Sequence, residues 1–381
     1  MSVTPATRHD YALVLLFFLL SLALYFLPTG FGEKVDADAV RCTGTVVSVD
    51  DSEVGHFGLI RKGEQGVTLE IRDGPFAGQR FDAHNQLLGQ LDRDKLFRPG
   101  DTAYVVITVG GKGEVLYVNP QAHYRLGLEG LLLGLFVTLL VVFGGVTGLK
   151  ALLSFVFTGL AIWKVLVPLL LKGVDPVWLT LGLVTLLCAT IIFLVAGVNR
   201  VGLTAFFGAF LGVLTSCALA AYFTRALHVH GAVMPFAETL LYAGYSHLDL
   251  AKVYMAGVFL ASSGAVMDLA MDVAASMGEV VSRNPGLSRA EAVRSGLRVG
   301  RAVVGTMTTT LLLAYSGGYV TLLMAFMAQG IPLGSTFNFI YVAAEVLKTL
   351  VGSFGLVTVA PFTAVVGGFL LAGRGTAISR G

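Results

Sequence analysis

Residues 263–280 read SGAVMDLAMDVAASMGEV and lie inside a long apolar segment, which carries the carboxylates Asp268, Asp272 and Glu279. At ~100° per residue in a helix, spacings of four and eleven residues place all three carboxylates on one face. Charged side chains inside a membrane helix are unfavourable and usually mark ion or substrate pathways. The stretch therefore predicts a membrane-spanning helix with a functional acidic face.

The composition is typical of a polytopic membrane protein. Of the 381 residues, 55% are hydrophobic and 13% are charged, with a mean hydropathy of +0.78, whereas soluble domains carry about 25% charged residues. The net charge of +2 argues against a nucleic-acid partner. The cysteines Cys42, Cys188 and Cys217 lack metal-ligand spacing and are interpreted as small buried residues. These features favour neither an enzyme nor a bound cofactor, and they assign no metal.

The chain divides into three predicted regions: an N-terminal transmembrane anchor (1–30), an extracytoplasmic β domain (31–125) and a transmembrane helical domain (126–381). The first apolar run, 11–28, is longer than the ~7–15-residue core of a signal peptide, so we interpret it as a retained anchor. Cleavage after the small-x-small triplet at 37–39 is the alternative.

Residues 31–125 alternate polar and apolar side chains in five short stretches rich in β-branched residues, which predicts five strands. The stretches are RCTGTVVSVD, GVTLEIRD, QRFDAHNQ, DTAYVVITV and EVLYVNP, and the segment 97–101 (FRPGD) predicts a turn before the fourth. Five strands in about 80 residues suggest a small all-β, OB-like barrel. Because both charge signs are mixed and no aromatic–basic stripe is present, the barrel is interpreted as a structural module.

The fold class expected is an α-helical polytopic membrane protein of about eight spans, with the β domain inserted after the first helix. Apolar runs of about 20 residues can cross a bilayer. Besides the anchor, the predicted spans are 127–147, 149–171, 177–198, 201–224, 251–280, 302–328 and 350–372. The segments 232–249 and 335–349 are amphipathic, and they remain open as interfacial, re-entrant or spanning pieces.

Arginines decide the predicted orientation. The loop 281–301 carries five of them, and positive charge concentrates in cytoplasmic loops. With this loop inside, eight spans place both termini in the cytoplasm and the β domain outside the cytoplasmic membrane.

Burial and a neighbouring like charge both disfavour ionisation of a carboxyl group. Asp268 and Asp272 are therefore expected to exchange protons near neutral pH, as a proton relay or a cation site requires. The alternative is a structural ion pair, with Lys164 or Lys348 as partner. A dyad of an aspartyl protease is disfavoured because both aspartates lie on one helix.

The span after the arginine-rich loop contains GTMTTTLLLAYSGG (305–318), in which Thr306, Thr309 and Thr310 share a face. Their hydroxyls are expected either to line the acidic path or to bond their own helix backbone, as is common in membranes. Gly317 and Gly318 predict a bend in this helix.

The acidic stretch 263–280 followed by LSRAEAVRSGLRVGRAVVGTMTTTLLLAYSGG (287–318) resembles the YibE/F family of multispanning membrane proteins. An N-terminal anchor and a small β domain ahead of the spans agree with the same family. The resemblance implies a membrane fold and little defined biochemistry.

A weaker likeness is to SecD/SecF and other RND proteins, which couple proton flow to work outside the membrane. Gly264, Asp268 and Glu279 match their acidic span, and residues 288–310 match the span that follows. This likeness implies a proton-carrying role for Asp268 and Asp272. The chain departs from RND proteins by having one such unit, more spans and a smaller outer domain.

The function predicted is that of a transporter or ion-coupled membrane protein. A proton or cation would move along Asp268, Asp272 and Glu279, with Thr306, Thr309 and Thr310 lining the path. Its expected partners are the lipid bilayer, the proton or cation and an unidentified substrate, and a protein partner at the β domain is a further expectation. The alternative is a structural or assembly factor whose β domain binds a partner.

Overall fold

The structure, a computed structural model, describes residues 8–31, 39–111 and 113–372. The chain divides into two compact units, Gly30–Val142 and the combination of Met1–Thr29 with Phe143–Gly381.

The first of these units contains a five-stranded antiparallel sheet with strand order β3-β2-β1-β4-β5. Its strands are β1 (Ala39–Phe57), β2 (Ile60–Ile71), β3 (Arg80–Leu88), β4 (Thr102–Val109) and β5 (Val115–His123). The five predicted strands are therefore confirmed. The turn before β4 is also confirmed, because Gly100 adopts φ 93° and Asp101 N donates to Arg98 O at 3.0 Å.

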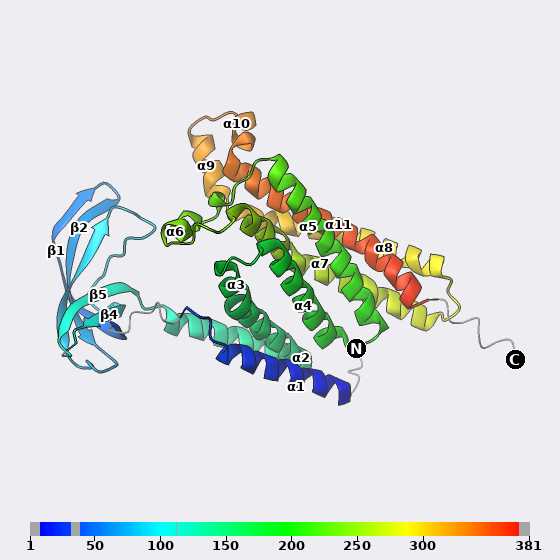
Figure 1. Cartoon of the computed structure of the whole chain (residues 1–381), viewed down its shortest axis with the longest axis horizontal. Helices are drawn as coiled ribbons and strands as arrows, with labels where there is room; N and C mark the ends of the chain where they lie inside the picture. Colours follow the sequence, from blue (N-terminus) through cyan, green and yellow to red (C-terminus); the bar gives the residue numbers. More distant parts are fainter. Residues whose placement is uncertain (1–7, 32–38, 112, 373–381) are drawn as a thin grey trace. The chain divides into compact units, whose positions relative to one another are not determined.

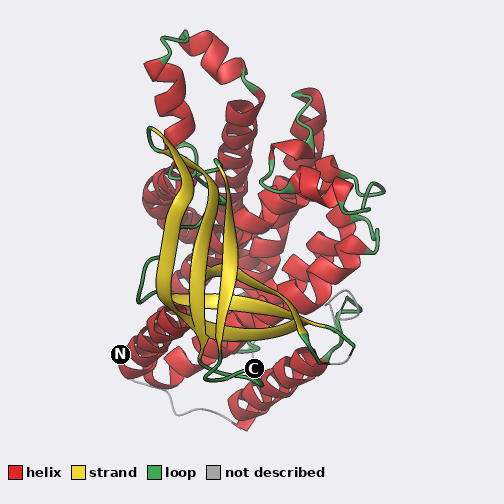
Figure 2. Cartoon of the chain, turned by 90° about the vertical axis from the view of Figure 1, so that its left-hand side faces the viewer, coloured by secondary structure: helices red, strands yellow, loops and turns green. Residues whose placement is uncertain are grey.

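The sheet curls because β1 is long and irregular. Its N-terminal part pairs with β4 and its remainder with β2, and its pairing with β2 shifts register at 46/48 and 50/53. Such bulges increase the twist of a sheet. The edge strands β3 and β5 consequently approach each other, so the sheet is nearly closed and encloses a core that includes Leu69, Phe97 and Ile107 (Figure 2).

The other unit is a helical bundle, preceded by α1 (Arg8–Phe26). Its main helices are α4 (Pro176–Ala196), α5 (Arg200–Ala226), α7 (Leu250–Arg283), α8 (Arg289–Ser316) and α11 (Ile340–Leu370) (Figure 1). Shorter elements connect them: η2 (Ile162–Leu166), α3 (Val167–Leu171), η3 (Gly231–Val233), α6 (Ala237–Tyr242), α9 (Val320–Ala328) and α10 (Leu333–Asn338).

α2 (Leu126–Ala161) extends across the boundary between the two units. Gly145 leaves the helical region within it (φ 52°, ψ −129°), and this break lies close to the junction expected between the spans 127–147 and 149–171.

Glycines allow α5, α7 and α11 to pack closely. A Cβ atom at Gly212 of α5 would lie 2.8 Å from Val266 Cγ1 of α7 and 3.0 Å from Val359 Cβ of α11. Small residues allow membrane helices to approach in this way. α8 then packs across both α7 and α11, with Gly300 facing Ala360.

Five helical segments among the described residues are long and apolar enough to cross a membrane: Leu126–Leu171, α4, α5, α7 and α11. The pair α8 and α9, bent by 66°, would make a sixth, and Tyr11–Phe26 is a shorter apolar helix. The bend lies at the break that contains Gly317 and Gly318, where the sequence predicted it. These helices are those of a multi-pass membrane protein.

Two predicted boundaries are wrong. The helix that contains the last predicted span, 350–372, begins ten residues earlier, because residues 340–349 continue into α11 without a break and only 333–338 form the separate helix α10. The arginine-rich segment 281–301 is mostly helical instead of a loop. α7 continues to Arg283, and a capping box between Ser288 and Glu291 starts α8 directly afterwards.

Candidate functional site

One face of α7 is exposed from Gly257 to Glu279. From Gly257 onward, exposed residues recur at intervals of three or four, which is the spacing of a single helix face. The exposed residues are Gly257, Ala261, Gly264, Asp268, Asp272, Ala275 and Glu279, hereafter the acidic face. The opposite side of α7 is packed, with Val266, Val273 and Met277 fully buried.

Asp268 and Asp272 make no hydrogen bond or ion pair within the described residues of the chain. The two lysines considered as partners have other contacts. Lys348 pairs with Glu345 on its own helix at 2.9 Å, and Lys164 Nζ donates to the carbonyl oxygen of Leu27 at 3.0 Å. The structure therefore does not bring either lysine to the aspartates.

Glu279 has a local partner. Arg283 lies one turn later on α7 and donates to the Glu279 carboxylate at 2.5 Å, and both side chains are exposed. An exposed pair at this spacing contributes about 0.3–0.5 kcal/mol, so it leaves Glu279 free to exchange partners at this end of the face.

The threonines of α8 bond their own helix. Thr306 donates to Val303 O at 2.9 Å, Thr309 to Gly305 O at 3.2 Å, and Thr310 to Thr306 O at 3.0 Å. All three are exposed. The sequence left open whether these hydroxyls line the acidic path or bond their own helix backbone, and the structure shows the backbone bonds.

Packing between α7 and α8 fixes the depth of these threonines. Gly296 of α8 faces Met277 of α7, and Gly300 lies beside Val273. Because the register is antiparallel, extending it by one and a half turns brings Thr306 level with Asp268. The hydroxyls and the unpaired carboxylates therefore lie at similar depth on adjacent helices.

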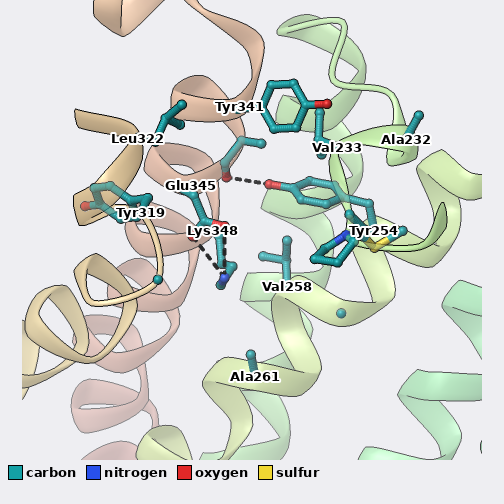
Figure 3. A pocket seen from close by; sticks show the side chains of 15 residues that line it. Ala232, Val233, Tyr254, Val258, Ala261, Tyr319, Leu322, Tyr341, Glu345 and Lys348 are labelled. Atoms are coloured by element: carbon teal, nitrogen blue, oxygen red, sulfur yellow. Dashed lines mark hydrogen bonds and ion pairs between the residues drawn. The ribbon is translucent and has the colours of Figure 1, made fainter. Parts of the chain in front are cut away.

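A cavity of about 610 Å³ lies at the N-terminal ends of α7 and α11 (Figure 3). α9 and the segment around η3 complete its wall. Its lining includes Val233, Tyr254, Val258, Tyr319, Leu322, Tyr341, Glu345 and Lys348. Cavities of this size hold small organic ligands.

Glu345 and Lys348 supply the charges of the cavity. Lys348 Nζ lies 2.9 and 3.3 Å from the two oxygens of Glu345, and the side chains keep 28% and 29% of their surface exposed, respectively. The same ammonium lies 5.1 Å from the centre of the Tyr315 ring, within range of a cation–π interaction. Tyr254 donates its hydroxyl to Ala344 O at 2.5 Å and so fixes α7 against α11.

The acidic face and the cavity share residues. Gly257 and Ala261 belong to both. From Ala261 to Asp268 is seven residues, ~10 Å at 1.5 Å per residue. Gly264 lies between them, and a Cβ atom there would meet nothing within 4 Å. One exposed strip of α7 thus connects a cavity containing an ion pair to two unpaired carboxylates.

Sequence reasoning missed Glu345 and the cavity. The available signal was the spacing of Glu345 and Lys348 in YVAAEVLKT, where opposite charges three residues apart occur in an otherwise apolar helix. At this spacing the two side chains lie on the same face of a helix, so each can neutralise the charge of the other. The cavity tyrosines Tyr254, Tyr319 and Tyr341 could not be grouped from the sequence, because they come from three separated segments.

Within the described residues, no cluster of three or more His, Cys, Asp or Glu side chains could hold a metal ion. The three cysteines are buried and unpaired, and all lie in different elements.

Comparison with curated proteins and with solved structures gives no match. Comparison with family models gives one described as YibE/F-like protein, which matches residues 132–373. This range covers more than half of the chain and contains α4, α5, α7, α8 and α11, and with them the acidic face and the cavity. The chain belongs to the YibE/F family of membrane proteins.

Proposed function

We propose that the protein is a transporter or ion-coupled membrane protein that moves a proton or cation along the acidic face of α7. The observation that carries this proposal is the absence of a protein partner for Asp268 and Asp272 among the described residues, although both lie near the middle of a membrane-length helix. A carboxylate at that depth is unfavourable by at least ~2.5–3.5 kcal/mol unless water, a proton or a cation compensates it.

The proposed path begins at the cavity and ends near Glu279. Gly257, Ala261 and Gly264 leave space along the first two turns, and the two aspartates follow. Thr306 supports the path at the level of Asp268. The pair of Glu279 with Arg283 is exposed and weak, so an ion reaching that end can be released.

We propose further that the chain spans the cytoplasmic membrane eight times with both termini inside. The break at Gly145 supports counting α2 as part of two spans, and the bent pair α8 and α9 supports counting it as one. In this arrangement the arginine-rich segment between α7 and α8 lies in the cytoplasm, and the cavity opens toward the outside.

The β domain is proposed to be an OB-like barrel outside the membrane. Five antiparallel strands and the approach of β3 to β5 support a partly open barrel. We assign it the role of receiving a substrate or a protein partner outside the membrane.

The test is proton flux into proteoliposomes, followed with a trapped pH-sensitive dye under an imposed pH gradient. Asp268→Asn and Asp272→Asn keep the side-chain volume and remove the charge. We expect each to lower the flux at least tenfold and to leave the thermal stability unchanged, because no lysine loses a partner. Glu238→Gln, which removes an exposed carboxylate from the short helix α6, is the matched control and should keep the parental flux.

Unaltered flux in both aspartate variants would contradict the proposal. A large drop in melting temperature in either variant would instead assign the carboxylates to a structural role. If the parent itself shows no proton flux, sodium and divalent-cation gradients are tested with the same variants, and the proposal fails when none of these ions moves.

A further inference from the structure

The cavity at the ends of α7 and α11 contains an ion pair that is complete by itself. Glu345 and Lys348 pair with each other at 2.9 Å, both line the cavity, and each keeps more than a quarter of its side-chain surface exposed. Figure 3 shows the two side chains on the wall of α11, with Tyr254 and Val258 of α7 across the space. The cavity therefore has two opposite charges and no net charge.

This neutrality restricts which ligand can enter. A ligand carrying only an ammonium group would pair with Glu345 and leave Lys348 without its carboxylate. A ligand carrying only a carboxylate would do the reverse. Breaking one side of a partly shielded pair leaves the other charge without its partner, so a singly charged ligand loses part of what it gains.

We infer that the cavity binds a small zwitterion of the α-amino-acid class, with the ligand ammonium on Glu345 and the ligand carboxylate on Lys348. One internal ion pair is then replaced by two charge-assisted pairs, and the net charge of the site stays at zero. The inference deepens the proposed function by naming the substrate class of the same pathway, and it rests on that function for its transport role.

The remaining walls fit the rest of such a ligand. Val233, Val258 and Leu322 offer apolar surface for a side chain, and Tyr319 and Tyr341 add aromatic surface with hydroxyl groups. Tyr315 contributes through its contact with Lys348. Its ring keeps an attractive contact with the Lys348 ammonium at 5.1 Å, so Lys348 retains a favourable neighbour while Glu345 turns to the ligand.

Position supports a substrate site. The cavity adjoins the acidic face through Gly257 and Ala261, so an occupant would lie about two turns of α7 from Asp268. A ligand bound there would fill the cavity end of the acidic face and so lie beside the proposed ion path.

The experiment is equilibrium binding to the purified full-length protein in detergent by titration calorimetry. The probes are glycine, glutamine, leucine and phenylalanine. For leucine, the matched single-charge analogues are 3-methylbutylamine, which lacks the carboxylate, and 4-methylpentanoate, which lacks the ammonium. We expect saturable binding of at least one amino acid, with both analogues of leucine binding at least tenfold more weakly than leucine itself.

The double variant Glu345→Gln with Lys348→Met removes both charges, so neither is left without its partner and folding should be preserved. We expect this variant to lose amino-acid binding. The control is Asp175→Asn with Lys252→Met, which removes another ion pair, 2.7 Å long, from the same end of α7 but outside the cavity. This control should bind like the parent.

Absence of saturable binding for all four amino acids, equal binding of a single-charge analogue, or parental binding by the Glu345/Lys348 variant would each overturn the inference. Its failure is distinguishable from that of the proposed function. Amino-acid binding without ion flux in the parent would support the zwitterion site and reject ion coupling. Ion flux without amino-acid binding would support ion coupling and reject the zwitterion site.

Discussion

Gln65 and Asn85 are directly opposite each other in the β2–β3 ladder, and Asn85 Nδ2 donates to Gln65 Oε1 at 3.1 Å inside the barrel. The amide of Gln65 also bonds both backbone groups of Phe97, at 3.0 and 3.1 Å. This fully buried side chain thus holds the segment before the turn at 97–101 against the sheet.

Replacing Gln65 with Met should destabilise the β domain by about 1–3 kcal/mol, because the backbone N–H of Phe97 and the amide of Asn85 each lose an acceptor while buried. Gln86→Met, at the exposed neighbouring position on β3, should change stability by less than about 0.5 kcal/mol. Urea-dependent labelling of Cys42 in the full-length protein, with the other two cysteines replaced by alanine, measures both. Equal midpoints for the two variants would contradict the role of Gln65.

Cys42 should itself be unreactive in the folded protein. Burial in the barrel core, with a smaller effect of the negative charge on Asp73, raises the pKa of the Cys42 thiol to about 11. Compared with the ordinary value of 9.0, its thiolate is then roughly 100-fold rarer near neutral pH. Maleimide labelling at pH 7.5 should be slower by at least that factor and recover on denaturation. Labelling of the native protein at the rate of a free thiol would contradict this burial.

The packing of α8 predicts opposite effects for two glycines on that helix. A Cβ atom at Gly300 would lie 2.6 Å from Ala360 Cβ, whereas one at Gly305 would meet nothing within 4 Å. Gly300→Ala should therefore lower stability by about 1–3 kcal/mol through overpacking. Gly305→Ala should be neutral or stabilising, because alanine favours the helix. Thermal melts in one detergent compare them, and a similar loss in both would reject the close contact between α8 and α11.

The contact between Asp175 and Lys252 predicts a dependence of stability on pH. The Lys252 ammonium hydrogen-bonds the carboxylate at the N-terminus of α4, and this contact holds the pKa of Asp175 below its usual range. A lowered pKa means that the stabilisation is present above the unfolded value of about 3.9 and is lost as the pH falls through the folded value. Asp175→Asn keeps the helix cap and removes the charge. The difference in melting temperature between parent and variant should be largest at pH 6–7 and shrink below about pH 4. A difference that stays constant with pH would contradict the assigned charge effect.

The proposed topology is testable with single cysteines on a cysteine-free background. Leu59 lies in the exposed turn between β1 and β2, and Pro285 lies between α7 and α8. An impermeant maleimide added to intact cells should label Leu59→Cys, and Pro285→Cys should react only after the membrane is permeabilised. Labelling of both from the same side would reject the orientation.

Much of the fold was predictable because its signals are local. Alternation of side chains identified the five strands, and apolar runs identified α4, α5 and α7. The end of α8 was predictable because two consecutive glycines weaken a helix. The start of α11 was not, because Glu345 and Lys348 make residues 340–349 look amphipathic. Their spacing of three residues was a signal for mutual pairing, and the structure shows this pair in a helix that continues without a break.

For the candidate site, the common face of Asp268, Asp272 and Glu279 followed from helical periodicity alone. That neither Lys164 nor Lys348 pairs with the aspartates did not follow from the sequence, because Lys348 was not weighed against Glu345, its nearer partner on the same helix. The cavity was beyond sequence reasoning for a different reason. Its wall combines α7, α9, α11 and the segment near η3, and their juxtaposition depends on packing between distant parts of the chain.

The hydrogen bonds of the α8 threonines have a consequence for which ions the proposed path would accept. A hydroxyl has one proton to donate, and Thr306, Thr309 and Thr310 have each given theirs to a carbonyl of their own helix. Only lone pairs remain on their outward side. If the proposed path runs along this surface, these lone pairs and the carboxyl oxygens of Asp268 and Asp272 line it, and such a lining favours protons and metal cations over anions such as chloride. In the proposed transporter, the internal hydrogen bonds of α8 would thus contribute to the selection of cations over anions.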